Sequence, residues 1–226
     1  MLPMSTRGAT LAWAASIVLL LGAFAPGSVS GQATGDVPYA VLYEALAPAV
    51  AIRRYPRLLP VQRVESKLDG VAPDSIRIRI GTGAEAIDVP VGADGTIDFP
   101  LQAALLAANP PVRTNQPRGS LTLSVTLALR VPAGPRLAAD AIRAALADVD
   151  ALMAETAGGA PRARGVEFRF PAGAGASLNL SGAGERVLVA DAHDRIVLMR
   201  DTDLQPPAAL LEFSTAPVLV LPWMGR

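Results

Sequence analysis

The sequence contains no cysteine, one histidine, His193, and one lysine, Lys67. The missing cysteines exclude disulfides, thiolate nucleophiles and attachment of lipid to a lipoprotein-type cysteine. With neither a thiolate nor a second histidine, a zinc site of the usual kind lacks its ligands. His193 lies between Asp191 and Asp194 in an expected turn, and we interpret it as a solvated turn residue. We therefore predict no metal and no cofactor, and the sequence identifies no catalytic residue.

An excess of charge of either sign is also missing. The chain has 20 basic and 20 acidic residues. Leaving out residues 1–33 removes one basic residue, Arg7, so the remainder has a formal charge of −1. This balance carries no electrostatic footprint for nucleic acid or for anionic lipid, so we predict no nucleic-acid partner. Arginine in place of lysine, with abundant alanine, glycine and proline, is typical of a GC-rich bacterial genome.

The first 33 residues have the pattern of a secretory signal peptide. Arg7 is the only charge before Asp36, an apolar run of about 14 residues extends from Leu11 to Phe24, and small residues follow. The run is shorter than the roughly 20 residues that span a bilayer, and no later segment is long and apolar enough to do so. We predict a signal peptide at residues 1–33 and a periplasmic or secreted protein. An uncleaved N-terminal anchor is the alternative.

The remaining chain alternates helical and strand patterns. The apolar spacing predicts helices over 36–47, which Pro48 ends or kinks, and over 136–155. The segment 75–80 alternates isoleucine with arginine, which is typical of an antiparallel sheet with one face in water. The segment 121–131 is the longest expected strand, and we expect it to lie centrally in its sheet.

Two expected β-hairpins organise the chain, at residues 87–101 and 187–199, each around a turn that contains aspartate. Strand and helix patterns repeat at offsets of 102 and then 100 residues. We predict an α+β protein of two related halves, residues 34–134 and 135–226, packed together as one globular unit. Each half is expected to hold a helix on a small antiparallel sheet. An internal duplication explains the repeat, and coincidence between alternating patterns is the alternative.

The loop from Pro111 to Gly119 is the best candidate for a binding site. It gathers Arg113, Asn115, Gln116 and Arg118 between prolines, just before the long strand. Functional loops have this composition, and so do ordinary solvated crossovers. A second polar group, the arginines between positions 53 and 57, is either a solvated connector or an anion-binding edge.

Signals of catalysis are weaker. Asp94, Asp98 and Asp194 fall at or next to the expected hairpin turns, but no serine lies in a G-x-S-x-G elbow. Asp201 and Asp203 lack the spacing of a calcium-binding loop.

We therefore predict a non-enzymatic periplasmic binding or accessory module that acts through its sheet edges or the polar loop. Exposed edges would let a partner protein of the cell envelope add a strand. A carboxylate and serine hydrolase acting in the envelope is one alternative. A structural subunit of an envelope complex is another, and would expose an apolar patch. The sequence identifies neither the ligand nor the partner.

Overall fold

The computed structural model describes residues 16–19, 36–157, 162–181, 185–205 and 210–225. Most of the predicted signal peptide, residues 1–33, lies outside these ranges. Within them the chain forms four α-helices and antiparallel strands in four sheets, which makes a mixed α+β fold rich in strand. None of the described helices is both long and apolar enough to cross a membrane.

The first half, residues 34–134, forms two sheets, and the segment Ser16–Leu19 from before it adds a strand to one of them. Their strand orders are β1-β8-β3-β6 and β2-β7-β4-β5. The strands are β1 (Ser16–Leu19), β2 (Val37–Pro38), β3 (Leu58–Ser66), β4 (Ile78–Ile80), β5 (Ile87–Val89), β6 (Thr96–Ile97), β7 (Pro111–Thr114) and β8 (Leu121–Leu129). The helices are α1 (Tyr39–Ala45), α2 (Ala47–Arg53) and α3 (Ala103–Ala108). The strand β1 comes from the N-terminal segment and adds to the edge of β8.

The second half, residues 135–226, also forms two sheets, with strand orders β13-β10-β15 and β12-β11-β14-β9. Its strands are β9 (Arg136–Ala138), β10 (Gly165–Arg169), β11 (Ser177–Ser181), β12 (Arg186–Val189), β13 (Arg195–Met199), β14 (Leu210–Phe213) and β15 (Leu219–Trp223). Its helix is α4 (Ala139–Ala157). Each half thus has two sheets, where the sequence predicts one.

The strand orders of the two halves correspond when the strands are taken in chain order. The order β8-β3-β6 matches β15-β10-β13, and β2-β7-β4-β5 matches β9-β14-β11-β12. The pairing register sets Ile78 in the same place as Leu178, and the turn bonds set Gly95 in the same place as Asp194. Equivalent residues are therefore 100 positions apart in β4 and β11, and 99 positions apart in the central turns. The expected offset of 102 for the segment 75–78 is wrong by two residues.

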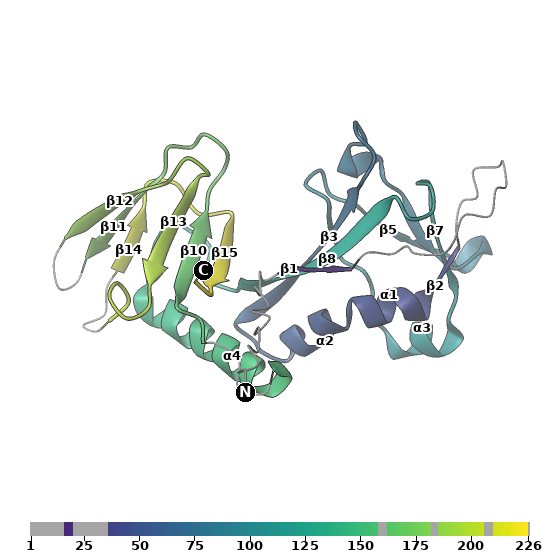
Figure 1. Cartoon of the computed structure of the whole chain (residues 1–226), viewed down its shortest axis with the longest axis horizontal. Coiled ribbons are helices and arrows are strands. Elements are labelled where there is room, and N and C mark those ends of the chain that lie inside the picture. Colours follow the sequence, from purple (N-terminus) through teal and green to yellow (C-terminus); the bar gives the residue numbers. More distant parts are fainter. Residues whose placement is uncertain (1–15, 20–35, 158–161, 182–184, 206–209, 226) are drawn as a thin grey trace, which may run out of the picture.

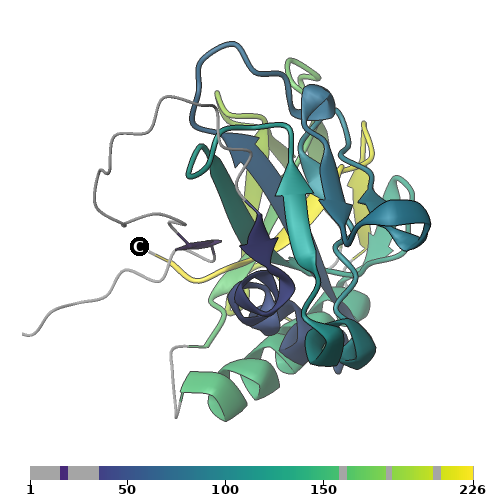
Figure 2. The ribbon, with the colours of Figure 1, turned by 90° about the vertical axis from the view of Figure 1, so that its right-hand side faces the viewer.

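The four helices lie along one side of the strands in both views of the ribbon (Figure 1, Figure 2). The longest, α4, buries an apolar stripe with the helical period, because Ile142, Leu146 and Val149 are each 0% exposed. Core residues from both halves belong to one continuous cluster. Its largest fully buried side chains include Tyr39, Phe99 and Phe168. The two halves therefore share one core.

The turns at the centres of the two expected hairpins form, but the strands on either side of each turn do not pair as hairpins. The N–H of Gly92 donates to the carbonyl of Thr96, and the N–H of Asp191 donates to that of Arg195. Beyond the first turn a single bridge, Val91 to Ile97, joins the two sides. The strand β5 then pairs with β4, and β6 with β3; likewise β12 pairs with β11, and β13 with β10. Each turn carries the chain from one sheet into another.

Proline and the sheet ladder set the boundaries that the sequence misplaces. The expected helix over 36–47 is two helices, since α2 continues past Pro48, which occupies its first turn without losing a hydrogen bond. The expected helix over 136–155 begins only at Ala139, because residues 136–138 form β9 against β14. The segment 121–129 is the expected long strand, and its central place depends on β1.

Candidate functional site

A row of four charged side chains crosses the water-facing side of the sheet β2-β7-β4-β5. Arg79 on β4 lies opposite Asp88 on β5 and opposite Arg113 on β7. Asp36, just before β2, completes the row. Arg113 makes two contacts with Asp36, Nε to Oδ1 at 3.0 Å and Nη2 to Oδ2 at 3.2 Å. Arg79 Nε lies 3.4 Å from Asp88 Oδ1. We call Asp88, Arg79, Arg113 and Asp36 the charged row.

A second pair of residues lies one step along the same face. Asn115 Oδ1 accepts from the N–H of Arg77 at 2.8 Å, and its Nδ2 donates to the carbonyl of Ser75 at 2.9 Å. These bonds fix Asn115 as a brace between β7 and the segment before β4. Arg77 donates from Nη1 to the carbonyls of Asp74 and Ile76. Among the described residues, no carboxylate forms an ion pair with Arg77.

Three of the four row residues and this pair border one depression of about 600 Å³. We call it the trough; it is lined by Ile76, Arg77, Ile78, Arg79, Asp88, Val89, Pro90, Val91, Arg113, Thr114 and Asn115. Three arginines and one aspartate line it, and Asp36 pairs with Arg113. The ion pair with Asp36 raises the pKa of Arg113, so this side chain stays charged at every relevant pH. The trough is therefore cationic.

The predicted site residues do not converge as one group. Arg113 and Asn115 line the trough, but Gln116 is 9% exposed and Arg118 points to a different cavity. The segment is less irregular than expected, because Pro111–Thr114 is the strand β7. The Gln116 N–H donates to Thr114 Oγ1 at 3.2 Å, which turns the chain after β7. The polar loop thus divides between two neighbouring depressions: Asn115 borders only the trough, Arg118 borders only the second cavity, and Arg113 borders both.

The second cavity is small, about 70 Å³, and mostly apolar. We call it the apolar cavity; its apolar wall consists of Val37, Leu42, Ile78, Val112, Leu121 and Leu123. Arg113, Thr114 and Arg118 also border it. It lies between β8 of one sheet and β4 and β7 of the other.

The sequence pattern contains part of the signal for the trough. The alternation of isoleucine and arginine over 75–80 correctly places Arg77 and Arg79 on a wet face. It could not show that Arg113 pairs beside Arg79, since this register joins residues 34 positions apart. Asp36 and Asp88 were not among the predicted site residues for the same reason.

The matching row of the second half has different chemistry. By the pairing register, Asp88, Arg79, Arg113 and Asp36 correspond to Val187, Asn179, Glu212 and Arg136. The last two form an ion pair of 2.8 Å, with the charges exchanged between the strands. Asn179 and Val187 replace the arginine and the aspartate, so the cationic trough is a feature of the first half.

The arginines between positions 53 and 57 are paired within the chain. Arg53 contacts Asp98 at 3.0 Å, Arg54 contacts Glu155 at 2.6 Å, and Arg57 contacts Asp148 at 3.4 Å. The last two pairs join the first half to α4. The bond from Arg54, followed by one from Tyr55, holds the pKa of Glu155 below its usual value. This cluster therefore ties the two halves together.

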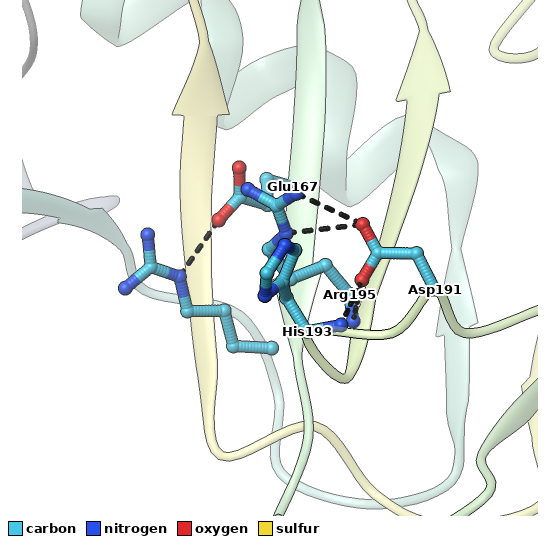
Figure 3. Close-up of polar contacts among 5 residues, drawn as sticks. Glu167, Asp191, His193 and Arg195 are labelled. Atoms are coloured by element: carbon cyan, nitrogen blue, oxygen red, sulfur yellow. Dashed lines mark hydrogen bonds and ion pairs between the residues drawn. The ribbon is translucent and has the colours of Figure 1, made fainter.

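Local hydrogen bonds and an ion pair hold the turn that contains His193. His193 is exposed, and its backbone N–H donates to Asp191 Oδ1 at 2.8 Å. Figure 3 shows the Asp191 carboxylate facing the Arg195 side chain, with Glu167 behind it. The side-chain bond from Arg195 lowers the pKa of Asp191 to about 2. Glu167 is buried and accepts from Arg169 Nε at 2.7 Å. These contacts brace the turn, and His193 faces water.

The remaining acidic candidates have partners of their own. Asp98 is 91% exposed, and Asp94 bonds Thr96, whose hydroxyl is the first cause of a lowered pKa of Asp94. Asp194 accepts from the N–H of Gly173 at 3.0 Å. Asp203 is buried, with one oxygen bonded by Met199 N–H and the other by Arg186. None of these four acids lines the trough or the apolar cavity. The hydrolase alternative stays a prediction.

Throughout the described ranges, no group of three or more histidine, aspartate or glutamate side chains could hold a metal ion. Comparison of the chain with models of protein families, with curated proteins and with solved structures found no match. Its function is therefore inferred from geometry and chemistry alone.

Proposed function

We propose that this chain is an exported, non-enzymatic binding module of the bacterial envelope, and that the trough binds an anionic group of its ligand. The observation that carries the proposal is the placement of three arginines, Arg77, Arg79 and Arg113, around one depression on the wet face of a sheet. The export follows from the N-terminal pattern of the sequence.

The charge balance of the trough favours an anion. The two aspartates of the charged row can balance only two of the three guanidinium groups. Like charges on directly opposite strands destabilise a sheet, and Arg79 lies directly opposite Arg113. An anion placed between these two arginines relieves that repulsion. A carboxylate or phosphate matches the planar fork of arginine with two parallel hydrogen bonds.

The size of the trough favours a small molecule or the acidic end of a larger one. Ligand sites of about 300–1,000 Å³ are typical for metabolites and cofactors, and the trough falls within that range. Pro90, which is exposed, and Val91, which is half-buried, also line the trough and offer contact to a carbon skeleton beside the anionic group. A small organic acid or phosphate ester suits this combination.

We also propose that the two halves arose by duplication and then diverged in use. The matched strand orders and the ion pairs at matching positions, Asp36 with Arg113 and Arg136 with Glu212, support this origin. In the second half Asn179 stands where Arg79 stands in the first. The duplication therefore left the cationic trough in one half only, and one anion is expected to bind per chain.

Isothermal titration calorimetry with inorganic phosphate and with succinate tests the anion site, and glycerol serves as the neutral comparison. Replacing Arg77 or Arg79 by glutamine removes a charged hydrogen bond, which is worth about 1.5–3 kcal/mol. We expect the affinity for the tighter anion to fall about tenfold or more in each variant. Added salt should also weaken binding, because the site is exposed.

Arg118→Gln is the matched control. It removes the same charge from the nearby polar segment 111–119, but Arg118 borders the apolar cavity and does not line the trough. We expect it to bind the anion as the unaltered chain does. Equal losses in Arg118→Gln and Arg79→Gln would mean that only net charge matters, and would contradict a site in the trough. Heats no larger than those of glycerol with either anion would contradict it as well.

A further inference from the structure

One edge of β8 is covered by a short segment from far away in the chain. Ser16–Leu19 runs antiparallel to β8, with Ile17 opposite Val125 and Leu19 opposite Leu123. Figure 1 shows this segment, β1, as a short purple strand beside β8. Among the described strands of the second half, none takes the corresponding place beside β15. The pairing of β1 with β8 thus has no counterpart at the edge of β15 within the described ranges.

The backbone of β8 presents hydrogen-bonding groups to this edge. The N–H of Arg130 donates to the carbonyl of Arg57, so the even-numbered residues of β8 bond toward β3. Backbone groups alternate sides along an antiparallel strand, so the N–H and C=O of Leu123 and Val125 point to the other edge. These groups pair with Ser16–Leu19, and an extended segment that displaces it gains the same main-chain bonds.

The side chains at this edge select apolar partners. Leu123 and Val125 are 7% and 5% exposed with Ile17 and Leu19 opposite them. An added strand in this register places one of its residues opposite Leu123. The residue two positions later then lies opposite Leu121, which lines the apolar cavity. Most of the wall of this cavity is apolar and offers water few hydrogen bonds, so an aliphatic group is the favoured occupant of its 70 Å³.

We propose that the edge of β8 now covered by Ser16–Leu19, together with the apolar cavity, forms an acceptor site for an extended segment of a partner protein. The segment adds antiparallel to β8 and carries aliphatic residues at alternate positions. The chain's own Ser16–Leu19 pairs with the same edge and shows that its backbone accepts an antiparallel strand. Anion binding in the trough is not required. The proposal depends on the proposed export in one respect only: removal of residues 1–33 as a signal peptide would uncover this edge of β8 in the cell.

Peptide binding to the full-length chain tests the acceptor without any cleavage. The substitutions Ile17→Asp and Leu19→Asp place charges opposite Val125 and Leu123 and release β1. The probe is a fluorescent peptide of residues 14–21 with lysines appended for solubility, followed by anisotropy. We expect the unaltered chain to bind it about tenfold more weakly than the double variant, because its own segment competes as an intramolecular ligand. Equal affinities, or no binding to the double variant, would overturn the proposal.

Methylation of backbone nitrogens in the peptide separates strand addition from unspecific apolar contact. Methyl groups at the positions of Ile17 and Leu19 remove the N–H groups that face β8. We expect about a tenfold loss, since each hydrogen bond contributes about 0.5–1.5 kcal/mol. Methyl groups at the positions of Ser16 and Val18 are the matched control and leave binding unchanged. Equal effects of the two peptides would contradict a paired strand.

A cross-link tests the register in case the double variant does not fold. The chain has no native cysteine. Val18 lies opposite Ser124, and their backbone groups point away from each other, as suits a cross-strand disulfide. We expect Val18→Cys to form a disulfide with Ser124→Cys in the full-length chain and not with Thr122→Cys. Equal cross-linking at both positions refutes the register. Anion titration of the same chains is a separate readout, so failure of either site is recognised by itself.

Discussion

The hydroxyl of Tyr39 fastens α1 to the segment that leads into α3. Tyr39 is 0% exposed, and its ring lies 5.5 Å from that of Phe99 at an angle of 22°. Its hydroxyl donates to the carbonyl of Pro100 and accepts from the N–H of Gln102 at 3.0 Å. Tyr39→Phe keeps the ring and removes both bonds. The substitution therefore isolates one polar link within the core.

The expected cost follows from what the substitution leaves behind. The Pro100 carbonyl and the Gln102 N–H lose their partner in a partly buried place. An unsatisfied buried group costs about 1–3 kcal/mol, and partial access of water brings each toward the lower end. We expect the free energy of unfolding to fall by about 2 kcal/mol. For a chain of this length the melting temperature should fall by about 4–8 °C.

Urea unfolding followed by circular dichroism measures this difference. The comparison requires that the free energy of unfolding depends on urea concentration with the same slope in both proteins. Tyr43→Phe is the matched control. Tyr43 lies on the same helix, 6.0 Å from the Tyr39 ring, and its hydroxyl makes no hydrogen bond with the described residues. A surface-like change of less than about 0.5 kcal/mol is expected there. If the two variants unfold alike, the reasoning about the buried hydroxyl is wrong.

Two further outcomes are expected. A methyl group at Gly165 would overlap the backbone carbonyl of Leu198 on the paired strand, so Gly165→Ala should cost about 3 kcal/mol in urea unfolding. Gly70→Ala, with open space and a φ of +76°, should cost only about 1 kcal/mol, and equal costs would contradict the overlap. Asp191 has a pKa of about 2 when folded, against 3.8 as the reference, so its contribution to stability is complete above pH 4 and is lost as the pH falls through 2. A carboxyl titration by NMR should show that midpoint, and Arg195→Met should raise it; an unchanged midpoint would contradict the assigned cause.

Local patterns predicted the elements better than their pairing. The stripe of α4 and the alternation of β8 were readable because burial repeats with the period of the element itself. The two central turns were also readable, the first from its aspartate and glycines and the second from its aspartates. The partner of each strand was not, because a turn that crosses between sheets has the same local sequence as a hairpin. Pro90, which cannot donate to a ladder, is the one local hint that the β5 ladder stops at Val89.

The candidate site was half predictable for the same reason. Arg113 and Asn115 were recognised as donors in a polar segment, and Arg77 and Arg79 as residues of a wet strand face. Their meeting depends on the pairing of β4 with β7, which is a property of the sheet. Gln116 and Arg118 share the composition of their neighbours but follow the chain into the core and toward the apolar cavity.

Comparison of the two halves also indicates which arginine substitution is the better test of ligand binding in the trough. An ion pair occupies the position of Asp36 and Arg113 in one half and that of Arg136 and Glu212 in the other, with opposite polarity. Because the two pairs have opposite polarity and link the same kind of strands, we expect each of them to hold its outer strand whatever ligand binds nearby. A variant of Arg113 therefore mixes loss of this link with loss of any ligand contact. Arg79 corresponds to Asn179, and its pair with Asp88 has no counterpart in the second half, so its replacement reports on the trough more directly than that of Arg113.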